Sequence, residues 1–509
     1  MSQKPSRLHA QQPLRLASCI AIACGSLALG SSQASAQQAP RIVLRDDPSA
    51  RIFPSFRPDL ADGEQAGNNA NVLQVTNCED DGPGSLRAAV ASAGENDVVD
   101  LTELDCSLIT LTTGAIPVML NSLDIEGPGS DLLRIDGDNA DRLFLHYGGG
   151  HFDLRGLTLQ HGVNRTAGFH VAGGGCVASA GYLTLDHSTI TGCYAIGEGA
   201  YGGAVYAYSL SMIASTVERS TAYGVLDATS TAAFGGAAFV YTMDLTDSTV
   251  SGNRAEHRLD PPRTSYDIGG AVATVRGGSI LRSTVDSNYS LGRAGGVASF
   301  SNLAIINSTI SGNTALDEIG GGIFMRRPAT LALTSSTVTS NAAPDGAGVF
   351  LSMGGGTFQS SIVYGNTTTG VGMELQSSEP ATVVGANNLT GANGTALILP
   401  DDTMHTDPML LPLAFNGGLT RTHALPRAST AIDAGNNVAA STSDQRGEGF
   451  PRVVGAAADI GAFEFSASAQ SEPSSVPSLS TWTITLLGLL LAAFGSRWQS
   501  PSREDRKSA

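Results

Sequence analysis

The sequence predicts an all-β chain wound as a right-handed parallel β-helix. A Ser-Thr-(Ile/Val) phrase, or a close variant, recurs seven times between Ser188 and Ile362, and most copies precede a Gly-Gly step and a new apolar strand. Successive copies begin 27, 33, 35, 25, 28 and 24 residues apart, which is typical of a solenoid with a constant core and a variable insertion. The segments are rich in Thr, Val and Ile and are broken by Gly pairs, so short strands are expected, about three to a turn.

Alternation within a strand predicts which side chains face the core. In Leu183-Thr184-Leu185-Asp186, the two leucines are expected to point inward, and Thr184 and Asp186 outward. Each unit is too short and too polar to bury one face alone. Neighbouring turns must therefore stack to make a continuous core.

An asparagine follows the phrase in five turns: Asn253, Asn288, Asn313, Asn341 and Asn366. Asparagine tolerates a left-handed backbone, so each could form a local turn. Stacked from turn to turn, the same side chains could instead form a hydrogen-bonded ladder. Both interpretations are structural, and neither makes these residues catalytic.

Both ends of such a coil expose unpaired strand edges, so caps are expected. Ser85 follows a turn-forming Asp-Gly-Pro-Gly run and is predicted to begin a short amphipathic helix that covers the first turn. We therefore expect an N-terminal cap with the first coils (70–130), the β-helix repeats (131–400) and a C-terminal cap (401–465).

The first 36 residues have the pattern of a secretory signal peptide. A positively charged start is followed by an apolar stretch (16–30) and by the small residues Ala34-Ser35-Ala36, so cleavage is predicted between Ala36 and Gln37. A lipoprotein cysteine at Cys24 is a weaker alternative, because the apolar run before it is short. Residues 37–69 are predicted to be a flexible N-terminal segment.

The other end of the chain predicts a membrane anchor. After a polar linker (466–475), residues 482–494 are almost wholly apolar, and arginines and a lysine follow. This pattern predicts a transmembrane helix at about 480–497 with its basic tail in the cytoplasm, within a sorting signal that covers 476–509.

The residues at the start of this tail resemble a bacterial sorting signal of the form Ile/Val-Pro-Thr-Leu-Ser-x-Trp, known as IPTL-CTERM. The matching residues are Val476, Pro477, Leu479, Ser480 and Trp482. Ser478 stands where threonine is usual. The resemblance implies that an exosortase-type processing enzyme recognises and cleaves the tail.

Two further stretches resemble exported bacterial β-helix surface proteins. Gly84-Ser85-Leu86-Arg87-Ala88 is similar to the Cys-Ser-Leu-Arg-Glu-Ala start of that group, with Gly and Ala in place of Cys and Glu. Residues 407–464, which include Asn416-Gly417-Gly418 and Asp459-Ile460-Gly461, resemble the region that precedes the anchor in choice-of-anchor Q proteins. The resemblance implies a pectin-lyase-like solenoid with a cell-surface or secreted role.

Charge excludes one class of partner. Residues 37–475 hold 44 acidic and 22 basic residues, a net charge of about −22, and every basic residue there is arginine. A body this acidic is not a nucleic-acid binder, because neutralising phosphates requires a basic face. An anionic polysaccharide would need a bridging cation or a local patch of arginine.

Four cysteines remain after signal cleavage, which in an exported protein suggests two disulfides. Three pairings exist. We predict Cys78 with Cys106 and Cys176 with Cys193, because Cys176 lies in a Gly-rich strand and Cys193 occupies the asparagine position before the next turn. Metal binding is the weaker interpretation, since no Cys-x-x-Cys spacing is present.

No catalytic pattern is found. The pectin-lyase-like fold also houses lyases and hydrolases, but the body lacks lysine and hence their Arg-x-Lys pattern, and Gln160-His161-Gly162 only partly matches Gly-His-Gly. Five histidines lie at positions 146, 151, 161, 170 and 187 without metal-ligand spacing and are expected to form a surface row. No cofactor or metal site is predicted, and a Ca²⁺ requirement is left open.

The variable insertions are the candidate binding region. They are long in three consecutive turns (194–201, 221–234 and 254–268), and stacked turns should bring them together as one loop lip. Aromatic, arginine and carboxylate side chains suit a sugar or a peptide, although solvated loops without a role are equally consistent. The candidate residues are Tyr194, Tyr201, Tyr223, Arg254, Glu256, His257, Arg258, Tyr266 and Asp267.

Two functions follow from these observations. The first is a non-enzymatic surface protein, adhesin-like or associated with the extracellular matrix, that binds a glycan or another cell-surface component. It would be exported, anchored in the inner membrane by its C-terminal helix, and displayed or released once the tail is processed. The alternative is a polysaccharide lyase or glycoside hydrolase.

Overall fold

The computed structural model describes residues 70–165, 171–225, 232–257, 267–326, 328–352, 354–370 and 372–467. The described residues up to Phe465 form one compact unit. The predicted signal peptide, cleavage site, flexible segment, sorting motif and transmembrane helix lie outside the described residues. Within the described ranges, no helix combines the length and the apolar character that a membrane span requires.

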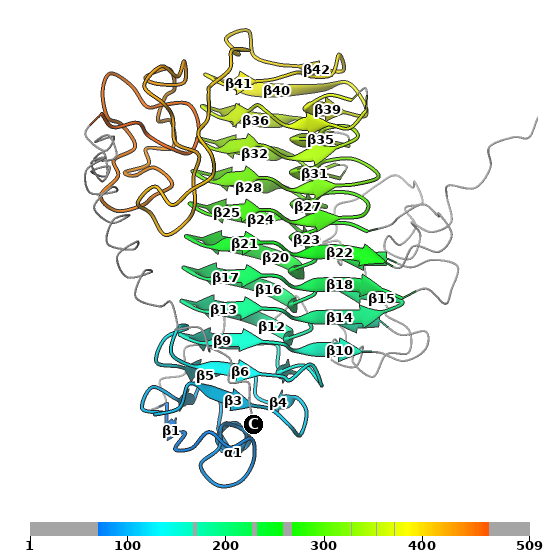
Figure 1. Ribbon diagram of the computed structural model, residues 1–509, viewed down its shortest axis with the longest axis vertical. Helices are drawn as coiled ribbons and strands as arrows, with labels where there is room; N and C mark the ends of the chain where they lie inside the picture. The colour runs from blue at the N-terminus through cyan, green and yellow to red at the C-terminus, as the bar shows by residue number, and fades with distance from the viewer. Residues whose placement is uncertain are drawn as a thin grey trace, which may run out of the picture. The chain divides into compact units, whose positions relative to one another are not determined.

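The described unit is a parallel β-helix of about eleven turns, as the repeat predicts (Figure 1). Strand pairs between turns run parallel, and their partners lie one turn apart in the sequence. The Ser-Thr-(Ile/Val) phrase supplies strands of an eleven-stranded sheet, in which Thr189, Thr216 and Thr249 are register partners. This sheet consists of β3 (Leu108–Thr110), β6 (Arg134–Asp136), β9 (Thr158–Gln160), β13 (Thr189–Thr191), β17 (Thr216–Glu218), β21 (Thr249–Ser251), β25 (Thr284–Asp286), β29 (Thr309–Ser311), β33 (Thr337–Thr339), β37 (Ile362–Val363) and β41 (Leu389–Thr390).

Two smaller sheets continue some of the turns. The eight-stranded sheet consists of β10 (Val163–Arg165), β14 (Tyr194–Gly197), β18 (Thr221–Gly224), β22 (Arg254–His257), β26 (Tyr289–Ser290), β30 (Thr314–Ala315), β34 (Ala342–Ala343) and β38 (Thr367–Thr368). The three-stranded sheet consists of β11 (Val171–Gly173), β15 (Gly199–Tyr201) and β19 (Ala232–Phe234). Among the described residues, this sheet has strands in three early turns, and two of them end the first two predicted insertions.

A twenty-stranded sheet closes each turn. In most turns the chain bends within this sheet, as between β23 and β24, and strands pair on both sides of the bend. In three turns the bend is crossed by one long strand: β12 (Val177–Asp186), β16 (Val205–Ile213) and β20 (Ala238–Thr246). In other turns two short strands replace it. These are β1 (Val72–Gln74), β2 (Val98–Asp100), β4 (Ile116–Val118), β5 (Leu123–Glu126), β7 (Phe144–His146), β8 (His151–Arg155), β23 (Val272–Thr274), β24 (Gly278–Leu281), β27 (Val297–Ser299), β28 (Leu303–Ile306), β31 (Ile323–Met325), β32 (Leu331–Thr334), β35 (Val349–Leu351), β36 (Gly356–Gln359), β39 (Leu375–Ser377), β40 (Ala381–Ala386) and β42 (Leu397–Ile398).

The predicted lid helix is present at the start of the coil. Helix α1 (Leu86–Ser92) begins after Ser85, whose hydroxyl accepts a hydrogen bond from the backbone N–H of Ala88 at 3.2 Å. Leu86, Ala89 and Val90 are buried, so the helix covers the apolar end of the first turns (Figure 1).

Buried polar ladders run beside the apolar core. Each asparagine after the phrase donates its side-chain amide to the next, as from Asn288 to Asn313 and from Asn313 to Asn341, both at 2.9 Å. The ladder interpretation is thus confirmed. Its last member, Asn366, gives its backbone N–H to Glu374 at 2.9 Å, so a carboxylate ends the series.

The serine that begins each phrase forms a second ladder. The backbone N–H of Ser215 donates to the hydroxyl of Ser248 at 3.1 Å, and the next turns repeat this bond. Because the serines are buried, the phrase recurs to satisfy backbone donors between turns. Its function is structural.

The two disulfides have the predicted pairing. Cys78 is joined to Cys106 and Cys176 to Cys193, with Cα atoms 6.5 and 5.6 Å apart. Among the described residues, no three or more His, Cys, Asp or Glu side chains are arranged so that they could hold a metal ion. In this part of the chain the cysteines therefore cross-link turns.

Residues 401–465 form a C-terminal segment that lies along the flank of the coil. After Met404 pairs with Leu389 in the last turn, the segment turns back over the outer face of the eleven-stranded sheet (Figure 1). The outward threonines of β25 and β29 bond it, since Thr284 donates to the carbonyl of Arg421 at 2.7 Å and Thr309 to the Gln445 side chain at 2.6 Å.

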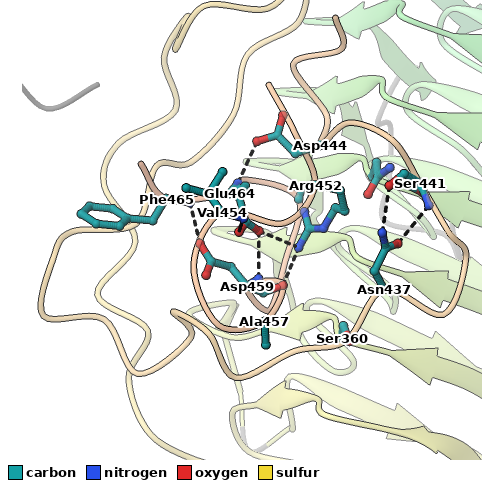
Figure 2. Close-up of polar contacts among 12 residues, drawn as sticks. Ser360, Asn437, Ser441, Asp444, Arg452, Val454, Ala457, Asp459, Glu464 and Phe465 are labelled. Carbon is teal, nitrogen blue, oxygen red and sulfur yellow. Dashed lines mark hydrogen bonds and ion pairs between the residues drawn. The ribbon is translucent and has the colours of Figure 1, made fainter. Parts of the chain in front are cut away.

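A cluster of buried charges fixes this segment (Figure 2). Three carboxylates, Asp444, Asp459 and Glu464, are buried with two guanidinium groups, Arg446 and Arg452. Arg446 pairs with Asp444 at 2.6 Å, and Arg452 lies 3.7 Å from Glu464. Both Glu464 oxygens also accept backbone N–H groups, from Val454 at 2.7 Å and Asp459 at 2.9 Å.

The stability of the C-terminal segment is expected to fall as the pH rises from about 5 to about 8. Burial raises the pKa of Glu464 from 4.5 to about 7, against its backbone hydrogen bonds and the Arg452 charge. Between these two values the folded state binds the additional proton, so stability is complete below the lower value and declines through the higher one. Thermal unfolding of the wild type at both pH values measures this effect.

The Glu464→Gln variant isolates the contribution of this carboxyl group. Because glutamine does not titrate, the variant should lose less stability than the wild type over the same pH interval. Equal pH dependence of the two proteins would show that Glu464 does not take up the proton.

Candidate functional site

Four aromatic side chains form a row on the outer surface of the twenty-stranded sheet. His151, Tyr182, Tyr208 and Tyr241 come from consecutive strands β8, β12, β16 and β20. Their ring centroids lie 5.1, 5.5 and 5.1 Å apart, with the first and last pairs stacked and the middle pair edge to face. We call these four residues the aromatic row. Tyr182 is 41% exposed, so the row is open to solvent there.

The strands position these rings without loops. Tyr182 is the register partner of His151. The long strand β16, which carries Tyr208, pairs in parallel with β20, which carries Tyr241. Between Ser179 and Tyr182 the register of β12 shifts, which is typical of a β-bulge. The shift brings Tyr182 next to Tyr208, which precedes its formal partner Ser209 by one residue.

Carboxylates lie beside the row on the same outer face. Asp124 on β5 and Asp153 on β8 are register partners, as are Glu126 and Arg155 two residues further along. Arg155 lies 3.4 Å from Glu126 and 3.7 Å from Asp153. Burial, with the Asp153 charge second, raises the pKa of Asp124.

The predicted loop lip is only partly a set of loops. Its three insertions begin as strands β14, β18 and β22 of the eight-stranded sheet, and the first two end as strands β15 and β19. The sequence predicts loops at these positions. Parallel pairing instead requires an extended backbone there. Arg258 and Tyr266 lie outside the described residues.

Several candidate residues do come together on the eight-stranded sheet. Arg254 forms an ion pair with Glu256 at 2.7 Å and lies over the ring of Tyr289, 4.3 Å from its centroid. Tyr223 is the register partner of Glu256. Tyr194 is exposed. It lies two strands from Arg254, because Thr221 is the register partner of both residues and lies between them. Arg254 is therefore already neutralised within its own sheet.

His257 and Asp267 form a buried pair. His257 Nδ1 lies 2.7 Å from the Asp267 carboxylate, and both side chains are almost fully buried. The hydrogen bond to Asp267 raises the pKa of His257. Asp267 also accepts the backbone N–H of Ala233 at 2.9 Å. The pair joins two turns and is not exposed for a ligand.

Tyr201 is separate from the other candidates. It lies on β15, stacks on Phe234 at 5.1 Å and meets Phe239 edge to face at 5.0 Å. Burial raises the pKa of Tyr201 to about 12. Tyr201 therefore belongs to the packing between the three-stranded and twenty-stranded sheets.

The histidines do not form the expected surface row. His146 is fully buried, and its Nδ1 lies 2.8 Å from the hydroxyl of Ser179. Burial lowers the pKa of His146, which favours a neutral ring. His151 belongs to the aromatic row, while His161 and His187 lie beside Asp136 and Asp186 on the coil surface. His170 lies outside the described residues.

Comparisons with known proteins give one match. No protein-family model matches the sequence, and no curated protein is significantly similar to it. Among solved structures, the chain is similar to a crystal structure of pectate lyase Pel9A, with 12% sequence identity, coverage of 78% of this chain and 98% of that chain, and a TM-score of 0.36.

Proposed function

We propose that this protein is an exported, non-enzymatic surface protein that binds an extended polysaccharide through the aromatic row. The observation that carries the proposal is the series of rings on four consecutive strands. Because neighbouring rings of the row stack on each other, the row can offer ring edges and tyrosine hydroxyl groups to a ligand, and these hydroxyl groups can exchange hydrogen bonds with the hydroxyl groups of sugars. Rings repeated at about the spacing of strands, 4.8 Å, suit a polymer lying along the coil.

The strand positions also favour binding by reducing its entropic cost. Tyrosine has few rotatable bonds, and each ring of the row is held by its neighbours, so little conformational freedom is lost when a sugar binds. The loop lip offers less, because Arg254 is paired and His257 and Asp267 are buried. We therefore place the binding surface on the twenty-stranded sheet.

Export is supported by the two disulfides, which persist in oxidising compartments. The partners proposed from the tail, the membrane and an exosortase-type enzyme, rest on the sequence pattern. In this proposal the tail holds the body at the inner membrane until it is processed, and the coil then presents its glycan surface outside the cell.

Replacing Tyr208 and Tyr241 with alanine is expected to weaken glycan binding about 10- to 100-fold, the loss of two ring contacts. Binding of the purified full-length protein to a glycan panel measures the effect, with thermal unfolding to confirm the fold. The matched control replaces Tyr194 and Tyr223, two tyrosines of the loop lip, and should bind normally. A loss confined to the control would place the site at the loop lip.

An enzyme is the second candidate, and the pair Asp124 and Asp153 favours it. Two neighbouring carboxyl groups beside an arginine, with the pKa of Asp124 raised by burial, resemble the arrangement that general acid and base chemistry uses. Incubating the protein with the glycan panel and scoring new reducing ends and unsaturated products tests this function. Products that disappear in Asp124→Asn would establish an enzyme in place of the proposed binding protein.

A further inference from the structure

The outer face of the twenty-stranded sheet is electrostatically divided along the coil. In the early turns, one column of outward residues includes Asp124, Asp153 and, at the end of the aromatic row, Asp244. In the later turns, the same column continues as Ser279, Ala304 and Ala332. The column therefore has carboxylates beside the row and uncharged side chains beyond it.

Two arginines lie over aromatic rings at this uncharged end. The Arg276 guanidinium lies 5.5 Å from the ring centroid of Tyr241, and its Nε donates to the tyrosine hydroxyl at 2.9 Å. The Arg326 guanidinium lies 5.2 Å from the ring centroid of Phe300. Both arginines follow first strands of the bend, β23 and β31, so they continue the line of the aromatic row.

Neither arginine forms an ion pair among the residues that the structure describes. Neighbouring arginines differ: Arg282 pairs with Asp247 at 2.6 Å, and Arg293 pairs with Glu318. In a chain with a net charge of −17, most described arginines find a carboxylate. Arg276 and Arg326 are held by rings instead, and apart from the bond from Arg276 Nε to Tyr241 no carboxylate among the described residues engages their guanidinium donors, which can bind an external anion.

Their spacing limits the ligand further. One turn, that of β27 and β28, separates the two arginines, so they stand about 10 Å apart along the coil at the usual strand spacing. This is close to the length of two sugars in an extended polysaccharide. A guanidinium binds a carboxylate through two parallel hydrogen bonds, which fixes the orientation as well as the position of the group.

We propose that the polysaccharide bound by the aromatic row is acidic, and that Arg276 and Arg326 each hold a carboxylate on alternate sugars. This inference rests on the proposed function, because the row supplies the remaining contacts. The arginines also replace a bridging cation, so binding proceeds without Ca²⁺.

The test uses oligosaccharides in which a uronic acid alternates with a neutral sugar, and the same oligosaccharides after chemical reduction of the carboxyl groups. Titration calorimetry with the full-length protein compares the wild type with the double variant Arg276→Ala and Arg326→Ala. The acidic ligand should bind the double variant about 100-fold more weakly, a factor of about ten for each charge-assisted contact. The reduced ligand should bind both proteins equally.

Arg134→Ala is the matched control, because Arg134 is an exposed arginine on β6 of another sheet with no ion pair among the described residues. It should leave both affinities unchanged. Binding of the acidic ligand should persist in EDTA and weaken as salt is added.

Each other outcome has a separate meaning. Equal losses in Arg134→Ala, or loss of binding in EDTA, would overturn the role of the two arginines. Binding of both ligands that depends on Tyr208 and Tyr241 alone would overturn the acidic specificity and leave the proposed function intact. No binding of either ligand by the wild type would overturn both.

Discussion

Replacing Asn313 with alanine is expected to lower the free energy of unfolding by about 3–6 kcal/mol. The Asn313 side chain donates to the carbonyl of Val285 and to Asn341, both at 2.9 Å, and accepts from the backbone and side chain of Asn288. Each buried group left without a partner costs about 1–3 kcal/mol, and alanine orphans several at once.

Denaturant unfolding followed by circular dichroism measures the Asn313 effect. Asn302→Ala is the control, because that side chain accepts its hydrogen bonds from Thr330 at the surface, where water can replace them. Local opening of neighbouring turns should show as faster amide exchange near Asn288 and Asn341. Similar losses in the two variants would mean that the ladder contributes no more than a surface bond.

Gly236→Ala is expected to be a strongly damaging small substitution in the coil, with a loss of more than about 3 kcal/mol and a low soluble yield. A Cβ at Gly236 would lie 2.1 Å from the carbonyl oxygen of Gly270 and 2.5 Å from the carbonyl carbon of Arg254. Both are backbone atoms of the next turn, which cannot move without breaking the hydrogen bonds that pair the turns.

The matched control for this substitution is Gly370→Ala. A Cβ at Gly370 would meet no atom closer than the carbonyl oxygen of Pro344 at 3.6 Å, which is an ordinary contact. Melting temperature and the soluble fraction of both variants give the comparison. A stable Gly236→Ala protein would show that neighbouring turns can separate to admit a methyl group.

The repeat was sufficient to predict the winding, because its position in each turn is set by bonds that every turn must make. Ser215 and Ser248 recur since each hydroxyl accepts a backbone N–H from the preceding turn. The asparagine ladder needed the structure, because a turn and a ladder require the same residue at the same position. Only the distance between Asn313 and Asn341 separates the two interpretations.

Two members of the aromatic row recur at a spacing that is visible in the sequence. Tyr208 and Tyr241 are 33 residues apart, as are Ser215 and Ser248, so they occupy the same position of consecutive turns. Tyr182 lies one residue nearer to its serine, Ser188, because it is the register partner of Ser209, one position after Tyr208. Aligning the turns on serine would have found two members of the row, and this offset of one position would have hidden the third.

The path of the C-terminal segment could not be predicted from the threonines that bind it. Thr284 and Thr309 occupy the same place in the phrase as Thr189 and Thr216, yet the first pair is buried under the segment and the second is not. Identical residues at one repeat position acquire different roles because another part of the chain reaches only some of them. Contacts across 137 residues, as between Thr284 and Arg421, leave no local pattern.

The flank attachment has a mechanical consequence. A pull on the chain at Phe465 would load contacts on several turns at once, from Gly461 bonded to Ser360 and Ala462 to Thr337, back to Arg421 paired with Asp286. A chain leaving from the last strand would instead be peeled, one turn breaking after another. A force that several contacts share is smaller at each contact. The coil should therefore resist a pull at Phe465 better than a pull at its last strand.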